Sequence, residues 1–258
     1  MKISVLVVVY NEERRLRECL NALKNFDELL VVDLGSKDHS TEIARGLGFT
    51  VIKHEWVPIV EMIIPTFLKG MRNDWVIRVD PDEILPIALV NELKNLEVSE
   101  KIAIIAIPFQ YYFLKKKLDT TVWGGIITGG RVINRNRMII GTEVHQHFYC
   151  KDGYEPLVLP YTGNNAVQHY WIDSYSQLFS KHERYLKMEG RARFSRGERF
   201  SLKEMIRQGL ISLKKGFIDK SGWRGGWTGW FLSFFYAQYV TRTWLALRQY
   251  ENSQKKLN

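Results

Sequence analysis

Along the first part of the chain, short continuous runs of apolar residues alternate with segments in which apolar residues recur at helical spacing. Ile3 to Val9 is a continuous run of strand formers, typical of a strand covered on both faces. Asn11 can then cap a helix, because Leu16, Cys19 and Leu20 fall on one face at helical spacing. The alternation continues with a strand at 29–32, a helix at 40–47 and a strand at 49–52. This pattern predicts an α/β fold with a Rossmann-like, mainly parallel sheet flanked by helices.

The pattern continues less regularly further along the chain. Residues 58–72 are expected to be helical in part, with a kink or break at Pro65. Strands are expected at 75–79 and 102–108, a helix at 86–96, and a hairpin pairing 131–134 with 138–140. From Ser174 onward the pattern is helical. We therefore predict an α/β domain at 1–173 and a basic, aromatic-rich helical extension at 174–258.

Polar residues follow three of the predicted strands at the points where those strands end. Val9 is followed by Tyr10-Asn11-Glu12, the second strand by Asp33, and the strand at 75–79 by Asp80-Pro81-Asp82-Glu83. In an open parallel sheet, ligands bind beyond the carboxyl ends of the strands. Acids and amides that converge on this edge would suit a nucleotide's base and ribose, with a metal ion for its phosphates.

Asp80 and Asp82 are separated by one residue, so in extended chain both side chains point to the same side. Pro81 biases Asp80 away from helix and preserves that geometry. Two oxygen ligands on one side suit Mg²⁺ or Mn²⁺, which keep positions open for water and a diphosphate. Taken alone, such a motif is more often a solvated turn, but its position after a buried strand favours the metal.

Three segments together resemble a known family. The runs SVLVVVYNEERRLRECLNAL, ELLVVDLGSKDHSTEIA and DWVIRVDPDEIL are similar to the family-two GT-A glycosyltransferases. The nearest resemblance is to the branch that includes lipopolysaccharide-core β-glucosyltransferases. It implies a GT-A fold and an inverting transferase that uses a nucleotide-sugar donor, with a UDP-sugar favoured, and a divalent cation, Mg²⁺ or Mn²⁺.

The resemblance also implies roles for individual residues. Val9-Tyr10-Asn11-Glu12 match the end of the family's first strand, where base and ribose are held, and Asp33 matches the first acid of its second motif. Asp80 and Asp82 match the family's D-x-D pair. Asp82 is then the direct metal ligand, while Asp80 assists through the ribose or metal-bound water.

Two departures from the family pattern bear on the donor site. Leu34 stands where many members have a second acid or a serine. Members of the nearest branch often have Arg or Lys soon after the position of Glu61, where this chain reads Met62-Ile63-Ile64. Phosphate contacts are therefore expected from elsewhere, with Arg131 and Lys53 as candidates.

Inversion requires a base that deprotonates the acceptor hydroxyl as it attacks the anomeric carbon. In GTEVHQHF, Glu143 and His145 lie two residues apart and would share one side of a strand. The family often places an acid just after a histidine here, where this chain has Gln146. We predict Glu143 as the base, with His145 as the rival or a metal-side ligand. His147 is expected to be structural, and His169 either completes the metal site or makes a core hydrogen bond.

The composition is ordinary for a folded protein, but the charge is unevenly distributed. Residues 181–258 carry 17 Lys or Arg and 6 Asp or Glu, a net +11, which leaves −2 for residues 1–180. Such asymmetry suggests an anionic partner; the alternative is a solvated helical surface. Cys19 and Cys150 lie far apart, and no leader pattern precedes Ile3, so we expect a reduced cytosolic protein with buried thiols.

The helical extension has the features of a membrane-surface segment. Gly225 to Thr241 holds 17 uncharged residues, which is marginal against the roughly 20 apolar residues that a span needs. Trp223, Trp227, Trp230, Tyr236, Tyr239 and Trp244 are interface-type aromatics, preceded by Lys203, Arg207, Lys214, Lys215, Lys220 and Arg224. We expect a helix lying against an anionic membrane surface, on its cytoplasmic face, near a glycan or lipid-linked acceptor. The alternative is packing against the α/β domain or a second subunit.

Two rival functions remain open from the sequence. Basic residues interleaved with aromatics are also used by single-strand nucleic-acid binders, although no RNA or DNA module is recognisable and no nucleic acid is expected. The other rival keeps the fold and loses the reaction, leaving an inactive nucleotide-binding protein. An oligomer is possible in each case.

Overall fold

The computed structural model describes residues 1–139 and 149–255. Within them the chain forms two compact units. The first, here called the sheet unit, consists of Met1–Gln110 and Ile126–Tyr170. The second, the helical unit, consists of Tyr111–Gly125 and Trp171–Asn258.

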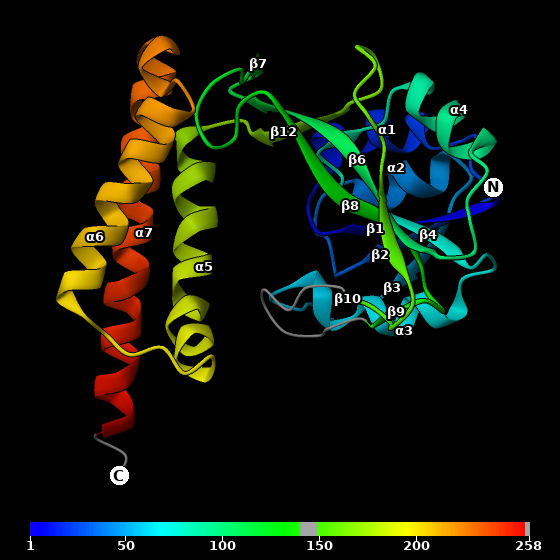
Figure 1. The fold of residues 1–258 in the computed structure, drawn as a ribbon. Helices are drawn as coiled ribbons and strands as arrows, with labels where there is room; N and C mark the ends of the chain where they lie inside the picture. Colours follow the sequence, from blue (N-terminus) through cyan, green and yellow to red (C-terminus); the bar gives the residue numbers. More distant parts are fainter. Residues whose placement is uncertain (140–148, 256–258) are drawn as a thin grey trace. The chain divides into compact units, whose positions relative to one another are not determined.

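The sheet unit contains a sheet with the strand order β3-β2-β1-β4-β8-β6-β12-β5, and β11 pairs with β6. Strands β1, β2, β3 and β4 are all parallel, whereas β8 is antiparallel to both β4 and β6 (Figure 1). The α/β fold predicted from the sequence is confirmed. The strands are β1 (Ile3–Val9), β2 (Glu28–Asp33), β3 (Thr50–Lys53), β4 (Trp75–Val79), β5 (Glu83–Ile84), β6 (Ile102–Phe113), β8 (Ile126–Asn134), β9 (Met138–Ile139), β10 (Tyr149–Cys150), β11 (Glu155–Val158) and β12 (Val167–Ile172).

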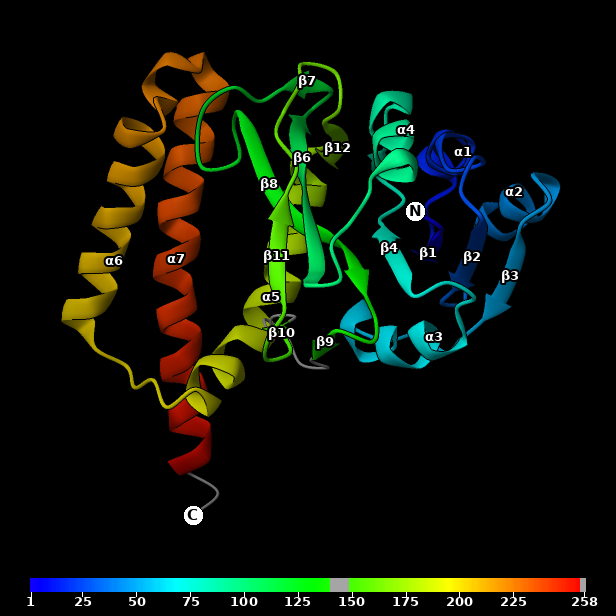
Figure 2. The same ribbon diagram turned by 45° about the vertical axis from the view of Figure 1, so that its right-hand side comes forward.

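Helices cover both sides of the parallel strands. All seven residues of β1 are buried, as its continuous apolar run predicts. Leu6 and Val8 pack in one cluster with Ile64 and Leu68 of α3. Helices α1, α2 and α4 lie on the opposite side of these strands from α3 (Figure 2). The helices are α1 (Glu13–Ala22), α2 (Ser40–Gly46), a 3-10 turn (Val60–Met62), α3 (Ile64–Gly70) and α4 (Ile87–Asn95).

Two local predictions are wrong. The residue at the N-terminal cap of α1 is Glu12, and Asn11 lies before it with a left-handed backbone. The predicted hairpin is absent from the described residues, because β8 pairs with β4 and β6, and β9 pairs instead with β10. Long-range pairing thus determines the partner of each strand here, and a short turn signal does not reveal it.

The helical unit is built from three long helices and the end of β6. Phe113, Trp171 and Leu178 pack with Leu232 and Phe235 in its core. Ser174 and Ser201 each accept a hydrogen bond from the backbone N–H three residues on, so they cap α5 and α6. The elements are β7 (Lys116–Lys117), α5 (Tyr175–Ser195), α6 (Leu202–Lys214), a π-helical turn (Lys215–Asp219), a 3-10 turn (Gly222–Arg224) and α7 (Gly226–Lys255).

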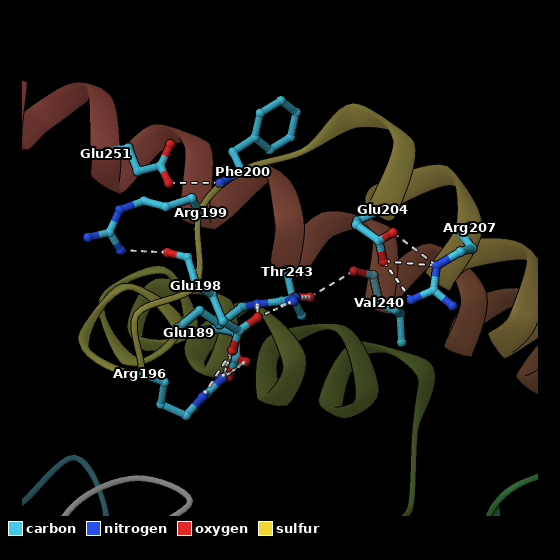
Figure 3. A network of polar contacts seen from close by, with 11 residues as sticks. Glu189, Arg196, Glu198, Arg199, Phe200, Glu204, Arg207, Val240, Thr243 and Glu251 are labelled. Atoms are coloured by element: carbon cyan, nitrogen blue, oxygen red, sulfur yellow. Dashed lines mark hydrogen bonds and ion pairs between the residues drawn. The ribbon is translucent and has the colours of Figure 1, made fainter.

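A polar network ties α5 and the loop that follows it to α7 at one end of the helical unit (Figure 3). The guanidinium of Arg193 on α5 donates to Glu198 Oε2 at 2.7 and 2.9 Å, and to Thr243 Oγ1 on α7 at 2.6 Å. It also lies 4.0 Å from the ring centre of Trp244. The loop between α5 and α6 is fixed to α7 as well, since Phe200 N–H donates to Glu251 Oε1 at 2.8 Å.

Among the described residues, none of the helices combines the length and the apolar composition that crossing a membrane requires. The prediction that the uncharged stretch of α7 does not span a bilayer agrees with this finding.

Candidate functional site

The carboxyl ends of β1, β2 and β4 lie side by side in the sheet unit. Val9 is opposite Asp33 in the β1–β2 register, and Val7 is opposite Val79 in the β1–β4 register. The polar residues that follow these strands therefore meet at one edge of the sheet. This edge is where open α/β sheets bind their ligands.

Hydrogen bonds connect the segments after β1 and β2. Asn11, with φ 56°, donates its N–H to Ser36 Oγ at 3.0 Å and accepts the N–H of Lys37 at Oδ1 at 2.8 Å. Glu12 N–H donates to Ser40 Oγ at 2.9 Å. Asparagine adopts a left-handed backbone more readily than most residues. Asn11 therefore holds the two segments together through both its backbone and its side chain.

Val9 and Asp33, two of the predicted nucleotide contacts, are buried. The carbonyl of Val9 accepts the Leu34 N–H at 2.9 Å, and Asp33 Oδ1 accepts the Ser36 N–H at 3.1 Å. The carbonyl of Asp33 accepts from His54 at 2.8 Å. In this structure both residues shape the strand ends, and their contact with a nucleotide stays a prediction.

Tyr10 forms an exposed aromatic pair that the sequence analysis missed. Its ring centre lies 6.4 Å from that of Trp56, with the planes inclined by 62°. Both side chains are well exposed at the end of the sheet where β1 stops. Aromatic faces of this kind stack with nucleobases without regard to sequence. The only signal in the sequence was the single residue Trp56 shortly after β3. Trp56 belongs to no periodic pattern, so its role could not be inferred.

The Asp80-Pro81-Asp82-Glu83 segment is a tight turn, so the expectation of extended chain is wrong. Glu83 N–H donates to the carbonyl of Asp80 at 2.9 Å, and Asp80 N–H donates to Glu83 Oε2 at 3.1 Å. Pro81 occupies the second position of this turn, where its fixed φ is favourable. The turn's own hydrogen bonds replace strand pairing until β5 begins at Glu83.

The antiparallel pair of β5 and β12 brings His169 to these acids. His169 lies opposite Glu83 in the register. Its Nε2 is 3.4 Å from Asp82 Oδ2, and its Nδ1 is 3.5 Å from Glu83 Oε1. The backbone N–H of Tyr170 donates to the carbonyl of Asp82 at 2.8 Å. The structure therefore places His169 beside Asp82, and its assignment to the metal site or to a core hydrogen bond stays a prediction.

Two arginines connect the acids into one cluster. Arg131 donates to Glu83 Oε1 at 2.6 Å and lies 3.6 Å from Asp80 Oδ2. Arg78 donates to Glu61 Oε1 at 3.1 Å, and its Nε lies 3.5 Å from Asp80 Oδ1. Arg131 thus contacts carboxylates in this structure, and its predicted phosphate contact stays a prediction. Arg78 was missed, although a charged residue within the apolar strand WVIRV was a visible signal.

Burial and charge shift the protonation of this cluster. Burial raises the pKa of Glu83 to about 7, against the opposing pull of the Arg131 guanidinium. Burial disfavours charged Arg78, but the Asp80 and Glu61 carboxylates more than offset this and raise its pKa. Burial, with a further contribution from Glu83, also raises the pKa of the Cys19 thiol. Cys19 is therefore an unreactive thiol.

The donor set around the turn fits a divalent cation in part. The Asp80 and Asp82 carboxylates are partly exposed, and His169 is adjacent. Over residues 1–139 and 149–255, no three His, Cys, Asp or Glu side chains are arranged to hold a metal ion by themselves. Mg²⁺ is commonly bound by one or two carboxylates together with water and substrate phosphates. The residues fit such a shared site and do not form a complete protein cage.

The remaining predicted residues fall into three cases. Glu143, His145 and His147 lie outside the described residues. Lys53 is exposed at the end of β3, opposite Asp33 in the register. Cys150 is only half-buried, so the expectation that both thiols are buried is wrong for this one.

A cavity of about 380 Å³ lies in the sheet unit next to the arginines. Its polar wall consists of Glu61, Arg78 and Arg131, and the rest is mainly apolar, with Leu6, Ile64, Leu68, Val76, Ile104, Gly130 and Ile133. A few polar groups in a largely apolar hollow are typical of small-molecule sites. The space is of a size that a sugar or part of a nucleotide occupies.

Comparison with known proteins determines the family. Residues 4–150, more than half of the chain, match the family described as "Glycosyl transferase family 2". The chain belongs to glycosyltransferase family 2. The family-level resemblance found in the sequence motifs is thereby confirmed.

This family-two chain is also similar to individual proteins. An uncharacterized glycosyltransferase of Rickettsia typhi is 38% identical over 100 residues, which are 38% of this chain and 34% of that protein. One of Rickettsia prowazekii is 37% identical over 100 residues with the same coverage. The chain thus matches about a third of the length of these curated relatives.

Solved structures of glucosyl-3-phosphoglycerate synthase from Mycobacterium tuberculosis are similar over part of the chain. The complex with Mn²⁺ and UDP-glucose is 24% identical, covers 43% of each chain and has a TM-score of 0.34. The complex with Mn²⁺, UDP and glucosyl-3-phosphoglycerate is 20% identical, covers 52% of this chain and 57% of that one, and has a TM-score of 0.37.

Proposed function

We propose that this family-two protein is an inverting glycosyltransferase of the type found in lipopolysaccharide-core synthesis. It moves a sugar from a nucleotide-sugar donor, with a UDP-sugar favoured, to a hydroxyl of a glycan or lipid-linked acceptor. The observation that carries the proposal is the cluster at the end of β4, where Asp80, Asp82 and His169 lie together beside the ends of β1 and β2.

The donor's nucleoside is proposed to bind at the end of β1. Tyr10 and Trp56 offer exposed aromatic faces for the base. Asn11 and Glu12 directly follow Tyr10 in the segment between β1 and α1. The hydrogen bonds of Asn11 to Ser36 and Lys37 fix this segment before the donor arrives, which lowers the entropy cost of binding.

Asp80 and Asp82 are proposed to hold Mg²⁺ or Mn²⁺ together with the donor's diphosphate. When bound, the cation would stabilise the negative charge of the departing nucleoside diphosphate. Arg78 and Arg131 keep the Asp80 carboxylate in place from two sides, at 3.5 and 3.6 Å. His169 fixes Asp82 in the same way from β12.

The acceptor side rests on the sequence. We propose Glu143 as the general base that removes the proton of the acceptor hydroxyl, with His145 as the rival. Glu143→Gln should lower transfer about a hundredfold or more while leaving donor binding unchanged, because the amide cannot accept the proton. His145→Gln made in parallel serves as the comparison. Full transfer in Glu143→Gln and loss in His145→Gln would assign the base to His145.

The test of the proposed function is thermal unfolding with UDP, GDP, CDP and their sugar conjugates, each with Mn²⁺ and with EDTA. A ligand that binds only the folded protein raises the unfolding temperature by mass action. We expect a shift with one nucleotide that needs Mn²⁺ and is absent in Asp82→Asn. Asp152→Asn, an exposed acid elsewhere in the sheet unit, should behave as wild type. A protein that responds to no nucleotide under any condition would contradict the proposal.

A further inference from the structure

The helices α6 and α7 form an antiparallel hairpin (Figure 1). Small residues lie at points where the two arms of the hairpin meet. A Cβ added at Gly209 would lie 2.7 Å from Thr241 Oγ1, and one added at Gly216 would lie 3.4 Å from the Cα of Ser233. Ser212 and Ser233 are buried in the same unit. Close backbone approach through Gly, Ser and Thr is typical of helix pairs in membranes, where large side chains face lipid.

The large apolar side chains of this hairpin lie on its outside. On α6, Leu202, Ile206 and Leu210 recur every four residues and are all exposed. An amphipathic surface helix normally turns such a stripe toward the protein core. This helix instead buries Ser212 and keeps Leu202, Ile206 and Leu210 in contact with solvent.

Helix α7 and the turns before it add an aromatic stripe. Trp227 is 75% exposed, and Trp230 and Phe234 are also exposed. Phe217 of the π-helical turn packs against both, with its ring centre 4.7 Å from that of Trp230 and 6.0 Å from that of Phe234. On each helix, the apolar stripe is rotated about the helix axis by a similar angle, and in the same sense, from the small residues at the contact. Because the helices are antiparallel, the two stripes therefore lie on the same side of the hairpin.

Basic residues border this apolar surface. From Leu202 to Trp227 the chain has six Lys or Arg and two Asp or Glu, a net charge of +4. The two acids pair locally, since Glu204 contacts Arg207 and Asp219 contacts Lys214, each at 2.6 Å. The basic residues are Lys203, Arg207, Lys214, Lys215, Lys220 and Arg224, and all six are exposed.

We propose that the outer face of the α6–α7 hairpin binds an anionic lipid bilayer by shallow insertion. The occupant is a bilayer because the surface combines lipid-type helix packing, exposed tryptophans and a basic border, and each of these matches a different layer of an anionic membrane. The insertion depth of such helices is about 5–10 Å. This inference concerns the helical unit and does not depend on the proposed transferase activity.

The structure also changes which residues carry the membrane prediction made from the sequence. Trp244 is buried, and Tyr236 and Tyr239 are only half-exposed, so these three aromatics serve the interior of the helical unit. Tyr236 packs on Trp123 at 5.5 Å, and Tyr239 on His182 at 4.9 Å. Their place on the surface is taken by the apolar stripe of α6, which the sequence analysis did not single out.

The test is flotation of the full-length protein with vesicles of phosphatidylglycerol and phosphatidylethanolamine, and with phosphatidylcholine vesicles for comparison. We expect binding to the anionic vesicles that weakens as salt rises. Ile206→Ser with Leu210→Ser should weaken it about tenfold or more, because both side chains lose their transfer into the interface. Lys215→Gln and Lys220→Gln should each weaken it about fivefold.

The matched control is Ile87→Ser with Val158→Ser in the sheet unit. These residues are each 58% exposed, against 53% and 64% for Ile206 and Leu210. The two double variants therefore remove similar amounts of exposed apolar surface. Wild-type vesicle binding by this control variant would support the assignment. Equal weakening in both double variants would overturn it.

Three further outcomes would each overturn the proposal. The first is that the protein does not float with anionic vesicles. The second is that it binds no vesicles but forms a dimer, which the Ile206→Ser with Leu210→Ser variant dissociates. The third is that it binds single-stranded RNA in a salt-sensitive way and binds no vesicles. Quenching of tryptophan fluorescence by brominated lipid gives a second readout. The quenching should fall in Trp227→Phe, and unchanged quenching would contradict insertion at this face.

Discussion

The sheet unit and the helical unit treat charge and apolar surface in opposite ways. In the sheet unit, Glu83 is 1% exposed and bonded to Arg131, which also faces Asp80, so charges are enclosed at the strand ends. In the helical unit the basic residues of α6 are exposed, and so are Ile206 and Leu210 beside them. One unit organises a polar pocket, and the other presents a surface.

The two units therefore differ in how their charged and apolar side chains are used. In the sheet unit they are buried and paired, and in the helical unit they are exposed and available to a binding partner. A buried, paired carboxylate is expensive to leave without its partner, so the sheet unit should respond strongly to single changes at the cluster. Exposed apolar residues contribute little to folding and can be changed with small effects on stability. Substitutions should therefore affect folding in the first unit and partner binding on the outside of the second.

The largest expected effect is on transfer activity in Asp82→Asn. Losing the carboxylate removes the proposed metal ligand and its contact with His169, and we expect at least about a hundredfold loss of turnover. The unfolding midpoint should change little, because Asp82 is partly exposed. The measurement is donor and acceptor turnover with Mn²⁺, with Asp152→Asn as control. Retained activity would remove Asp82 from the metal site.

The next effect concerns the stability of the sheet unit in Arg131→Met. This change leaves Glu83 buried without its cation, which we expect to cost about 3 kcal/mol of unfolding free energy in urea titrations. Glu83→Gln combined with Arg131→Met should recover much of that loss. Asp74→Asn, which breaks the exposed pair with Arg135, should cost less than about 1 kcal/mol. Equal costs for the two pairs would show that the cluster is not enclosed.

Local sequence signals were sufficient for the framework of the sheet unit. The apolar run of β1 and the helical spacing of Leu16, Cys19 and Leu20 gave the elements and their buried faces. Parallel order then implied that Asp33 and the Asp80 turn meet at one edge, because strand ends in such a sheet coincide. These features depend on the periodicity of apolar residues, which can be read from the sequence alone.

Features that depend on distant pairing could not be read from the sequence. Asn11 adopts a left-handed backbone because Ser36 and Lys37 of another loop bind it. His169 reaches Asp82 only through the β5–β12 pair, and no local pattern specifies that register. The direction of the apolar stripe of α6 depends on the glycines that let α6 pack closely against α7. In the sequence alone, these glycines only indicate a low helix propensity.

A smaller effect is expected from Gly229→Ala at the start of α7. A Cβ there would lie 2.1 Å from the carbonyl oxygen of Gly222, so the two turns must separate, at a cost of about 1–3 kcal/mol. Gly46→Ala at the end of α2 meets nothing within 4 Å and should be neutral or slightly stabilising. Thermal unfolding of both variants checks this. An unchanged Gly229→Ala variant would show that Gly229 and Gly222 are not close-packed.

The smallest effect concerns acid stability and His182 of α5. Its ring packs edge-on against Phe235 and Tyr239 at 4.7 and 4.9 Å, and its Nδ1 lies 2.8 Å from the Leu178 carbonyl. Burial lowers the pKa of His182, with a smaller opposing effect from the Leu178 bond. Below the unfolded pKa of about 6.5, the unfolded chain therefore binds a proton that the folded chain resists, and stability falls as pH decreases.

Replacing this histidine should reduce that sensitivity. Urea unfolding at pH 7.5 and at pH 5, roughly one unit or more on either side of the free histidine pKa, should show a smaller loss of unfolding free energy for His182→Gln than for wild type. At the higher pH the two proteins should differ only by the packing cost of the substitution, because neutral His182 contributes no linkage there. His54→Gln, whose ring is part of the sheet unit, is the comparison. If the pH dependence of wild type and His182→Gln were identical, the buried ring would not be what makes the helical unit acid-sensitive, and its charged surface would have to account for the effect.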